Sequence, residues 1–292
     1  MIYGFIDDHA KDFSIQKQCS VLEVSKSGYY GWLKGRSHQP SPAEVHKRQQ
    51  IISTFEHHRS RYGTRRIVAA LAEQGLPLSR SKVRGVLKQQ GLKAIQPRSF
   101  VPRTTDSRHS YPISPNLLLE RDAPQRVNEV WVGDITYIPL AEGRWAYLSV
   151  WMDLYSRKIV GWELMDHMKE ELVIAAMQKA LHARRPAAGL IIHSDRGGQY
   201  GSKAFRRLLG KGIRQSMSRA DNVYDNVFME SCFSRFKTEL LQGGMFQTIE
   251  DAYTEIFEYI EMYYNTERLH SSLGYKSPVR FEAEYQKSKI VL

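Results

Sequence analysis

The hydrophobic positions near the start of the chain recur every three or four residues, as they do along one face of a short amphipathic helix. This spacing predicts helices over residues 15–22 and 24–33, with a break at 23–25 and a serine that caps the second helix. Two helices joined by such a short break are typical of a helix-turn-helix. Residues 1–36 are therefore predicted to form an N-terminal helical segment of helix-turn-helix type.

A second group of helices follows a break that is rich in Pro and Ser. Its first helix is predicted over residues 43–58. Thr64 is expected to cap the next helix and Gly75 to end it, whereas Ser79 starts a third helix that ends at Gly91. The positions expected to face the core of this group are Val45, Ile51, Ile52, Phe55, Val83, Val86 and Leu87.

Positive charge is concentrated in the front part of the chain, which has 292 residues and a net charge of +11. Residues 1–125 contain 20 Lys and Arg against 10 Asp and Glu, whereas residues 126–292 contain 22 against 21. This asymmetry indicates a part that binds nucleic acid, placed ahead of a nearly neutral part. A merely solvated basic surface is the alternative.

Residues 43–93 form the candidate helical DNA-binding domain, because a helix, a turn and a basic helix are what docking in the major groove requires. Cations on its outer side would contact phosphates and supply affinity without sequence choice. A plain three-helix bundle with a solvated basic face is the alternative. The candidate DNA-contact residues here are Arg65, Arg66, Arg80, Lys82, Arg84 and Lys88.

Residues 94–125 change character, because prolines alternate with arginines there. They are interpreted as an extended basic linker, which could lie along a DNA backbone or act as a simple tether. The apolar pattern of strands begins after this linker, at 130–139, 145–153 and 157–165.

The rest of the chain alternates between helix and strand patterns. A helix over 169–183, a buried strand over 190–192, a helix over 202–210 and a strand over 213–217 are predicted in this order. The helix that carries Glu230 comes next, with Asp225 or Asn226 as its cap, and an amphipathic helix over 248–264 ends the pattern.

Three acids are candidates for chemistry. Asp195 ends the buried strand and would face a crevice at the sheet edge, although it could instead cap a helix or close a turn. Asp134 lies among apolar strand residues, so it needs a partner or a cation. Glu230 lies seven residues before Lys237, on the same helix face. Three such carboxylates would make an oxygen-ligand site for Mg²⁺ or Mn²⁺, and they would repel one another without the cation.

Four stretches of the sequence resemble a known family. They are WVGDITYIP (131–139), HSDRGGQY (193–200), RQSMSRADNVYDNVFMESCFSRFKTE (214–239) and YNTERLHSSLGYKSP (264–278). These stretches are similar to DDE transposases with a retroviral-integrase-like catalytic core, and above all to the second-frame protein of copy-out, paste-in bacterial insertion sequences. One departure is visible, because 34 residues separate Asp195 from Glu230 and the family usually has one more. The stretches on either side are undisturbed, so Glu230 is kept as the third acid.

The resemblance implies an α/β RNase H-like catalytic core over residues 126–245, with a five-stranded mixed sheet that sets Asp134 beside Asp195. A C-terminal helix and tail over 246–292 would pack on this core. Asp134, Asp195 and Glu230 match the catalytic, metal-binding triad of the family, which implies two Mg²⁺ or Mn²⁺ ions in each active site.

The function implied by the resemblance is metal-dependent DNA strand cleavage and strand transfer by a transposase that binds the terminal repeats of an insertion sequence. Lys237 is a candidate contact to a DNA phosphate, or simply a solvated lysine. The implied partners are transposon ends, target DNA, further copies of the chain on DNA and an upstream-frame helical protein joined by a frameshift. The rival interpretations are an RNase H-type nuclease that cuts without joining and a non-catalytic DNA-binding remnant.

Several other polar residues have two interpretations each. Asp153 is a strand-end acid outside the triad and is expected to be structural. His193 could orient a carboxylate, meet a phosphate or be a structural histidine. In the tail, Arg268, His270 and Ser271 either contact the substrate or dock the C-terminus on the core, and docking is the favoured interpretation.

A membrane protein and a disulfide-rich secreted protein are both disfavoured by the composition. No apolar run approaches the roughly 20 residues needed to span a bilayer, and the first residues are acidic where a signal peptide is basic. Cys19 and Cys232 provide neither a disulfide framework nor a metal-ligand spacing. The expected location is a reducing bacterial cytoplasm, in association with the nucleoid.

Overall fold

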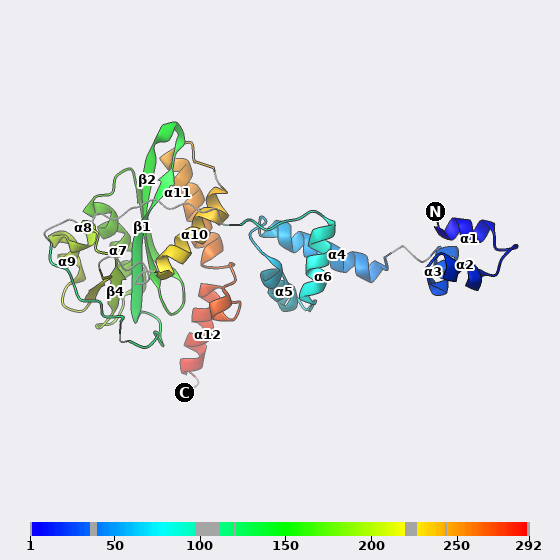
Figure 1. The fold of residues 1–292 in the computed structure, drawn as a ribbon. Helices are drawn as coiled ribbons and strands as arrows, with labels where there is room; N and C mark the ends of the chain where they lie inside the picture. The colour runs from blue at the N-terminus through cyan, green and yellow to red at the C-terminus, as the bar shows by residue number, and fades with distance from the viewer. Residues whose placement is uncertain are drawn as a thin grey trace. The chain divides into compact units, whose positions relative to one another are not determined.

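The structure is a computed structural model. It describes residues 2–35, 40–96, 111–119, 121–219, 227–242 and 244–290. The chain divides into two compact units, Met1–Lys93 and Ala94–Leu292, of which the first is built from helices and the second around a sheet (Figure 1). Over these described ranges, no helix combines the length and the apolar character that crossing a membrane requires.

The first unit begins with three short helices, α1 (Ile2–Asp8), α2 (Ile15–Val21) and α3 (Lys26–Leu33). The predicted break and serine cap are confirmed, because the Ser25 side chain accepts a hydrogen bond from the backbone N–H of Gly28 at 3.0 Å. A small core holds the three helices together, and its buried residues are Ile6, Cys19 and Tyr29.

The unit continues with α4 (Pro42–His57), α5 (Thr64–Glu73) and α6 (Arg80–Gln89). The predicted ends are confirmed, because Gly75 and Gly91 follow α5 and α6 with φ of 80° and 67°, a conformation that glycine adopts at little cost. The predicted start of α6 is also confirmed, since the side chain of Ser79 accepts a hydrogen bond from the N–H of Lys82 at 3.3 Å. The predicted core residues Ile51, Phe55, Val83, Val86 and Leu87 are buried.

Three details of this helical group differ from the prediction. Val45 is 38% exposed, because burial along α4 begins only at Ile51, and Ile52 is only partly buried. Thr64 is not the cap of α5, because Gly63 occupies the cap position and Thr64 is the first helical residue. The Thr64 hydroxyl accepts a hydrogen bond from Arg80 Nε at 3.2 Å instead, so it links the starts of α5 and α6.

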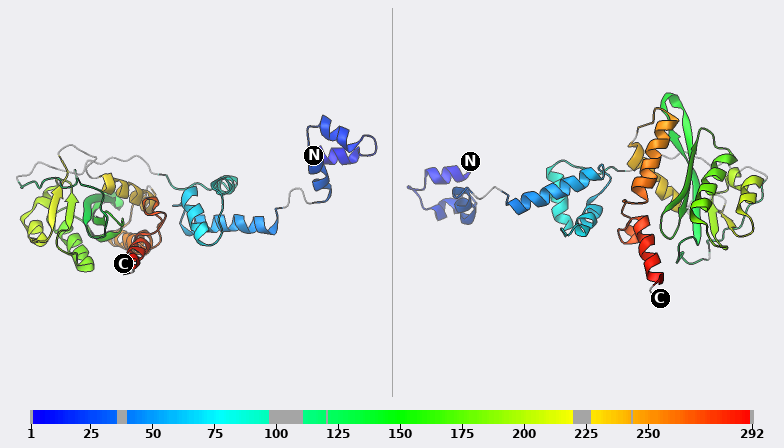
Figure 2. Two further views of the ribbon diagram at one scale, coloured as in Figure 1. Left: turned by 90° about the horizontal axis from the view of Figure 1, so that it is seen from below. Right: turned by 180° about the vertical axis from the view of Figure 1, so that it is seen from behind.

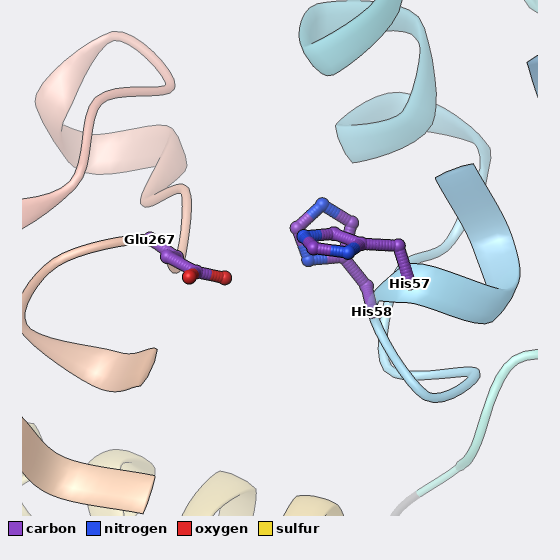
Figure 3. A group of neighbouring side chains, drawn as sticks. All are labelled: His57, His58 and Glu267. Carbon is purple, nitrogen blue, oxygen red and sulfur yellow. The ribbon is translucent and has the colours of Figure 1, made fainter. Parts of the chain in front are cut away.

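His58 lies directly after α4, where Figure 3 shows its ring next to that of His57. The His58 ring is buried and stacks on Tyr62, with the ring centroids 3.6 Å apart. Burial, followed by the positive charges of His57 and nearby arginines, lowers the pKa of His58 from 6.5 to about 4. Protonation of the His58 imidazole is therefore disfavoured in the folded unit, although it occurs near neutral pH in the unfolded chain.

The first unit is expected to lose stability as the pH falls from about 6.5 towards 4, because unfolded His58 takes up a proton over this range and folded His58 does not. Thermal unfolding at a series of pH values would measure the loss. His58→Phe keeps a ring on Tyr62 and should flatten the pH dependence, whereas the control His46→Gln, at an exposed position, should leave it unchanged. Equal pH dependence in His58→Phe and the natural protein would contradict this prediction.

The second unit is built on a mixed sheet of five strands, as the family resemblance implied, and their order is β3-β2-β1-β4-β5. The strands are β1 (Val130–Pro139), β2 (Trp145–Asp153), β3 (Ile159–Met165), β4 (Ile191–Ser194) and β5 (Arg214–Met217). The first three form an antiparallel meander, and η1 (Ala141–Gly143) makes the turn expected between β1 and β2. β4 pairs in parallel with both β1 and β5.

Helices cover both faces of the sheet (Figures 1 and 2). On one face lie α7 (Glu170–Arg184), α8 (Gly198–Gly201) and α9 (Lys203–Leu209), and on the other lie α10 (Val227–Leu241) and α11 (Ile249–Phe257). Trp131 and Ile135 of β1 pack in the core that includes α7. Because side chains alternate along a strand, Asp134 points to the opposite face, which α10 covers.

The predicted amphipathic helix over 248–264 is confirmed, but it changes type part-way. It is α-helical in α11 and becomes a π-helix in η3 (Glu258–Tyr264). The apolar residues Ala252, Ile256, Ile260 and Tyr263 of this helix are buried. Two elements follow that the sequence did not predict, η4 (Ser271–Leu273) and α12 (Pro278–Ile290).

Residues 111–119 belong to the predicted linker and lie against β5. Ser114 Oγ donates to Gln215 Oε1 at 3.2 Å, and the N–H of Leu117 donates to Ser216 Oγ at 2.9 Å. Residues 97–110 and 120 of the predicted linker lie outside the described residues, as do the proposed helix caps Asp225 and Asn226.

Candidate active site

The register of two parallel strands places two of the three acids side by side. β1 and β4 pair with Val132 opposite His193. Asp134 lies two residues beyond Val132, and Asp195 lies two residues beyond His193 and just past the end of β4. The parallel pairing therefore brings the two carboxylates to the same level of the sheet.

The backbone orients both aspartates. Asp134 Oδ1 accepts a hydrogen bond from the N–H of Ile135 at 2.8 Å, and Asp195 Oδ1 accepts one from the N–H of Gly197 at 2.9 Å. The residue before Asp134 must be glycine for the ring of Trp151 to pack here, because a Cβ at Gly133 would lie 2.5 Å from that ring. The two carboxylates are thus held on a rigid part of the fold.

Glu230 lies in the first turn of α10, the helix that covers this face of β1. Its negative charge acts on Asp134. Burial raises the pKa of Asp134 well above its usual range, and the negative charges of Asp195 and Glu230 raise it further. Three carboxylates from β1, β4 and α10 therefore interact at one site.

Lys237 lies on the same face of α10 as Glu230 and faces the same cluster. Burial lowers the pKa of its ammonium group, and the negative charge of Asp134 acts in the opposite direction. The cluster thus combines three acids with one partly buried cation, a combination that the seven-residue spacing of Glu230 and Lys237 indicated.

Tyr200 is a neighbour of the aspartates that the sequence analysis missed. Its side chain is 1% exposed and packs edge-on against Trp151, with the ring centroids 5.8 Å apart. Burial raises the pKa of its hydroxyl well above the usual range, and the charges of Asp134 and Asp195 add to the effect. The only sequence signal was its place in HSDRGGQY, five residues after Asp195.

His193 is a structural histidine. It is completely buried, its Nδ1 lies 2.8 Å from Ser216 Oγ, and its Nε2 lies 3.3 Å from Ser218 Oγ. Asp153 is also structural, because it accepts backbone hydrogen bonds from Asn128 at 2.6 Å and Ser156 at 2.9 Å at the end of β2.

The other candidate DNA-contact residues lie on α5 and α6 of the first unit. Arg65, Arg80, Arg84 and Lys88 are exposed, whereas Arg66 and Lys82 are partly buried. Lys82 pairs with Glu44, and the Arg66 guanidinium lies 5.5 Å from the centroid of the Tyr62 ring. Lys82 of α6 is therefore also paired with α4, and Arg66 packs on a residue just before α5.

Family models cover most of the chain. Two models described as integrase core domain match residues 124–222 and 211–278, and one described as HTH-like domain matches 43–100. An insertion element IS600 uncharacterized 31 kDa protein of Shigella sonnei is 41% identical over 271 residues, which are 91% of this chain and 98% of that protein. The transposase InsF for insertion sequence IS3A of Escherichia coli K12 is 38% identical over 285 residues, which are 97% and 98% of the two chains.

The chain belongs to the IS3-type insertion-sequence transposases. The family identified from the sequence is thus confirmed, and so is the class of enzyme: an IS3-type transposase binds DNA and catalyses transposition. Solved structures with lower likeness include a simian T-cell lymphotropic virus intasome in complex with PP2A regulatory subunit B56 gamma, which is 19% identical and covers 80% of this chain and 73% of that chain at a TM-score of 0.42. Another is the HTLV-2 integrase catalytic core domain in complex with magnesium, 16% identical, covering 53% and 95% at a TM-score of 0.39.

Proposed function

We propose that Asp134, Asp195 and Glu230 are the catalytic residues of this transposase and hold divalent metal ions, Mg²⁺ or Mn²⁺, two in each active site. The proposal is supported by the register of β1 and β4, which brings Asp134 beside Asp195, and by the raised pKa of Asp134, to which burial contributes most and the charges of Asp195 and Glu230 add. Carboxylates that raise one another's pKa are stabilised by a bound cation, which compensates their repulsion. Oxygen ligands suit hard divalent cations, so the donor set fits the metal.

The proposed reaction is an exchange of phosphodiester bonds. In the first step water attacks the phosphorus at the end of the insertion sequence, and the bond that breaks leaves a 3′ hydroxyl. In the second step this hydroxyl attacks a phosphodiester of another DNA site, so one bond forms as one breaks and no covalent intermediate with the enzyme is required. Bound divalent ions would activate the attacking oxygen and stabilise the leaving 3′ oxygen.

The residues of the chain supply the geometry of this reaction. The N–H groups of Ile135 and Gly197 fix the orientation of the two aspartates. Lys237, on the same helix face as Glu230, would contact a DNA phosphate, whose negative charge would favour its ammonium form as Asp134 does. The cations of α5 and α6 would bind phosphates of the terminal repeats in the first unit, where they supply affinity and position.

The assembly expected for this activity contains two transposon ends, target DNA and several copies of the chain. A frameshift fusion with an upstream-frame helical protein is part of the same proposal, as is a location in the bacterial cytoplasm at the nucleoid. The resemblance to second-frame transposases supports both.

A strand-transfer assay on the DNA that flanks this gene tests the proposed function. The natural protein should give joined products with Mg²⁺ or Mn²⁺ and none with a chelator, whereas Asp195→Asn should give none with either metal. Cleavage without joining would favour the nuclease. Binding without chemistry, unchanged after addition of the upstream product, would favour the non-catalytic remnant.

A further inference from the structure

The helix that carries Glu230 has two distinct faces. Glu230 and Lys237 share one face, and Phe236 and Glu239 lie roughly opposite, about half a turn around the helix. α10 contacts β1, and the charges of Glu230 and Lys237 on the first face act on Asp134 of that strand. The second is buried against residues that follow α11, at Phe236 and Glu239. Because α10 is one rigid helix, the contacts of Phe236 and Glu239 also determine the position of Glu230 and Lys237.

A buried ion pair holds the second face. Arg268 donates from Nε to Glu239 Oε2 at 2.8 Å and from Nη2 to Glu239 Oε1 at 2.7 Å. The hydroxyl of Tyr259 donates to Glu239 Oε2 at 2.9 Å. The exposed fractions of Glu239 and Arg268 are 4% and 2%, so this contact is screened very little by water. A two-bonded guanidinium fixes both the distance and the orientation of its carboxylate.

Contacts with aromatic rings further stabilise the position of α10 along its length. Phe236 packs edge-on against Tyr259 with the ring centroids 5.1 Å apart. Nearer the start of the helix, Cys232 Sγ lies 4.0 Å from the Tyr264 hydroxyl. At its first turn, the guanidinium of Arg157 lies 4.6 Å from the centroid of the ring of Phe228.

The segment that supplies Tyr259, Tyr264 and Arg268 is itself tied to the sheet. Asn265, which is 2% exposed, bonds both backbone groups of Ile159 at the start of β3, accepting from its N–H at 2.9 Å and donating to its carbonyl at 3.0 Å. The N–H of Arg268 donates to the carbonyl of Tyr263 at 2.8 Å. The π-helix η3 and the residues up to Arg268 therefore form a bridge from β3 to the rear of α10.

We propose that Arg268 is a positioning residue for the transposition reaction. Its contact with Glu239 fixes the position of α10 along its axis and its rotation about that axis. This contact therefore orients Glu230 towards the two aspartates. It does not contact the DNA, because a side chain that is 2% exposed and bonded to Glu239 is out of reach of a substrate. The proposal rests on the proposed function, since it concerns how the third acid is placed.

Arg268→Lys in the full-length chain tests the proposal, because it keeps the charge and removes the paired hydrogen bonds. The expected result is a fall in kcat for strand cleavage of about 10²-fold, the scale on which a small misplacement of a catalytic group acts. KM for the DNA should stay unchanged, the Mg²⁺ concentration for half-maximal rate should rise, and amide hydrogen exchange in α10 should become faster without metal or DNA.

Arg184→Lys is the matched control. Arg184 makes an equally paired contact to Glu282, at 2.7 and 2.8 Å, between α7 and α12. A kcat for Arg268→Lys equal to that of this control, or unchanged exchange in α10, would overturn the proposal. A rise in KM alone would also overturn it, because it would point to a DNA contact.

Tyr259→Phe is a milder second variant, for the case that Arg268→Lys does not fold. It removes one hydrogen bond to Glu239 and keeps the ring packed on Phe236, so kcat should fall in the same direction but less. Unchanged kcat in a folded Tyr259→Phe would contradict the proposal. The activity of Glu230→Gln is measured beside these variants. Retained activity of Glu230→Gln would contradict the proposed function. The amide hydrogen exchange of α10 would still report whether the Arg268 contact positions this helix.

Discussion

Asp134→Asn is expected to abolish strand cleavage and joining, by about 10³-fold or more, while DNA binding is retained. Asn is nearly the same size as Asp, but its amide is a poor ligand for a hard divalent cation and carries no charge. The cations expected to bind DNA in the first unit lie on α5 and α6, so they are unaffected. Cleavage and joining on labelled transposon ends, beside a binding titration of the same DNA, would measure both effects.

The same substitution is expected to raise the melting temperature of the protein in the absence of metal. Burial and the charges of Asp195 and Glu230 raise the pKa of Asp134, which means that its ionised form costs the folded core free energy. The neutral amide removes this cost. Asp166→Asn at an exposed position is the control and should change neither activity nor melting temperature. Full activity, or a lower melting temperature without metal, would remove Asp134 from the proposed site.

Arg184→Ala is expected to lower the free energy of unfolding by about 3–5 kcal/mol, the usual cost of removing one partner from a buried ion pair. Arg184 bonds Glu282 twice and lies 3.8 Å from Asp153, and both acids are buried. Burial alone would raise the pKa of Glu282, but the hydrogen bonds from Arg184 and Ser156 lower it below its ordinary value. The contribution to stability is therefore present at neutral pH and is lost as the pH falls into the acid range.

Urea unfolding of the full-length chain at neutral pH would measure this loss. Arg206→Ala on the exposed side of α9 is the control and should stay within about 0.5 kcal/mol of the natural protein. A loss for Arg184→Ala no larger than that of the control would show that water replaces the guanidinium. The comparison is also informative at low pH, where the difference between the two variants should shrink.

The sheet could be predicted from the sequence almost to the residue because its strands have short turns and consistent apolar patterns. β1 and β2 occupy 130–139 and 145–153, as expected, since the Glu142–Gly143 turn between them adopts positive φ. Parallel pairing of β1 with β4 was expected only through the family resemblance. A single sequence carries no signal that tells which distant strand pairs with which.

The contacts that support the candidate active site could not be predicted from the sequence, for a related reason. The tail residues were expected to dock on the core, and Arg268 does so, but its partner Glu239 was not predicted. Tyr200 was not singled out from the sequence, and α12 has a pattern that is too polar to reveal a helix. Each of these depends on long-range packing, which local patterns of polar and apolar residues do not encode.

The distance along the chain between the acids and their support has a consequence for protein synthesis. Asp134 is made first, Asp195 follows 61 residues later, and Arg268 lies another 73 residues beyond. The basic helical unit is complete on the ribosome long before the third acid can be held in place. On the roles proposed for the first unit and for Arg268, chains that stop early would occupy transposon ends without cutting them, so incomplete products would compete with the finished enzyme and would not nick the genome.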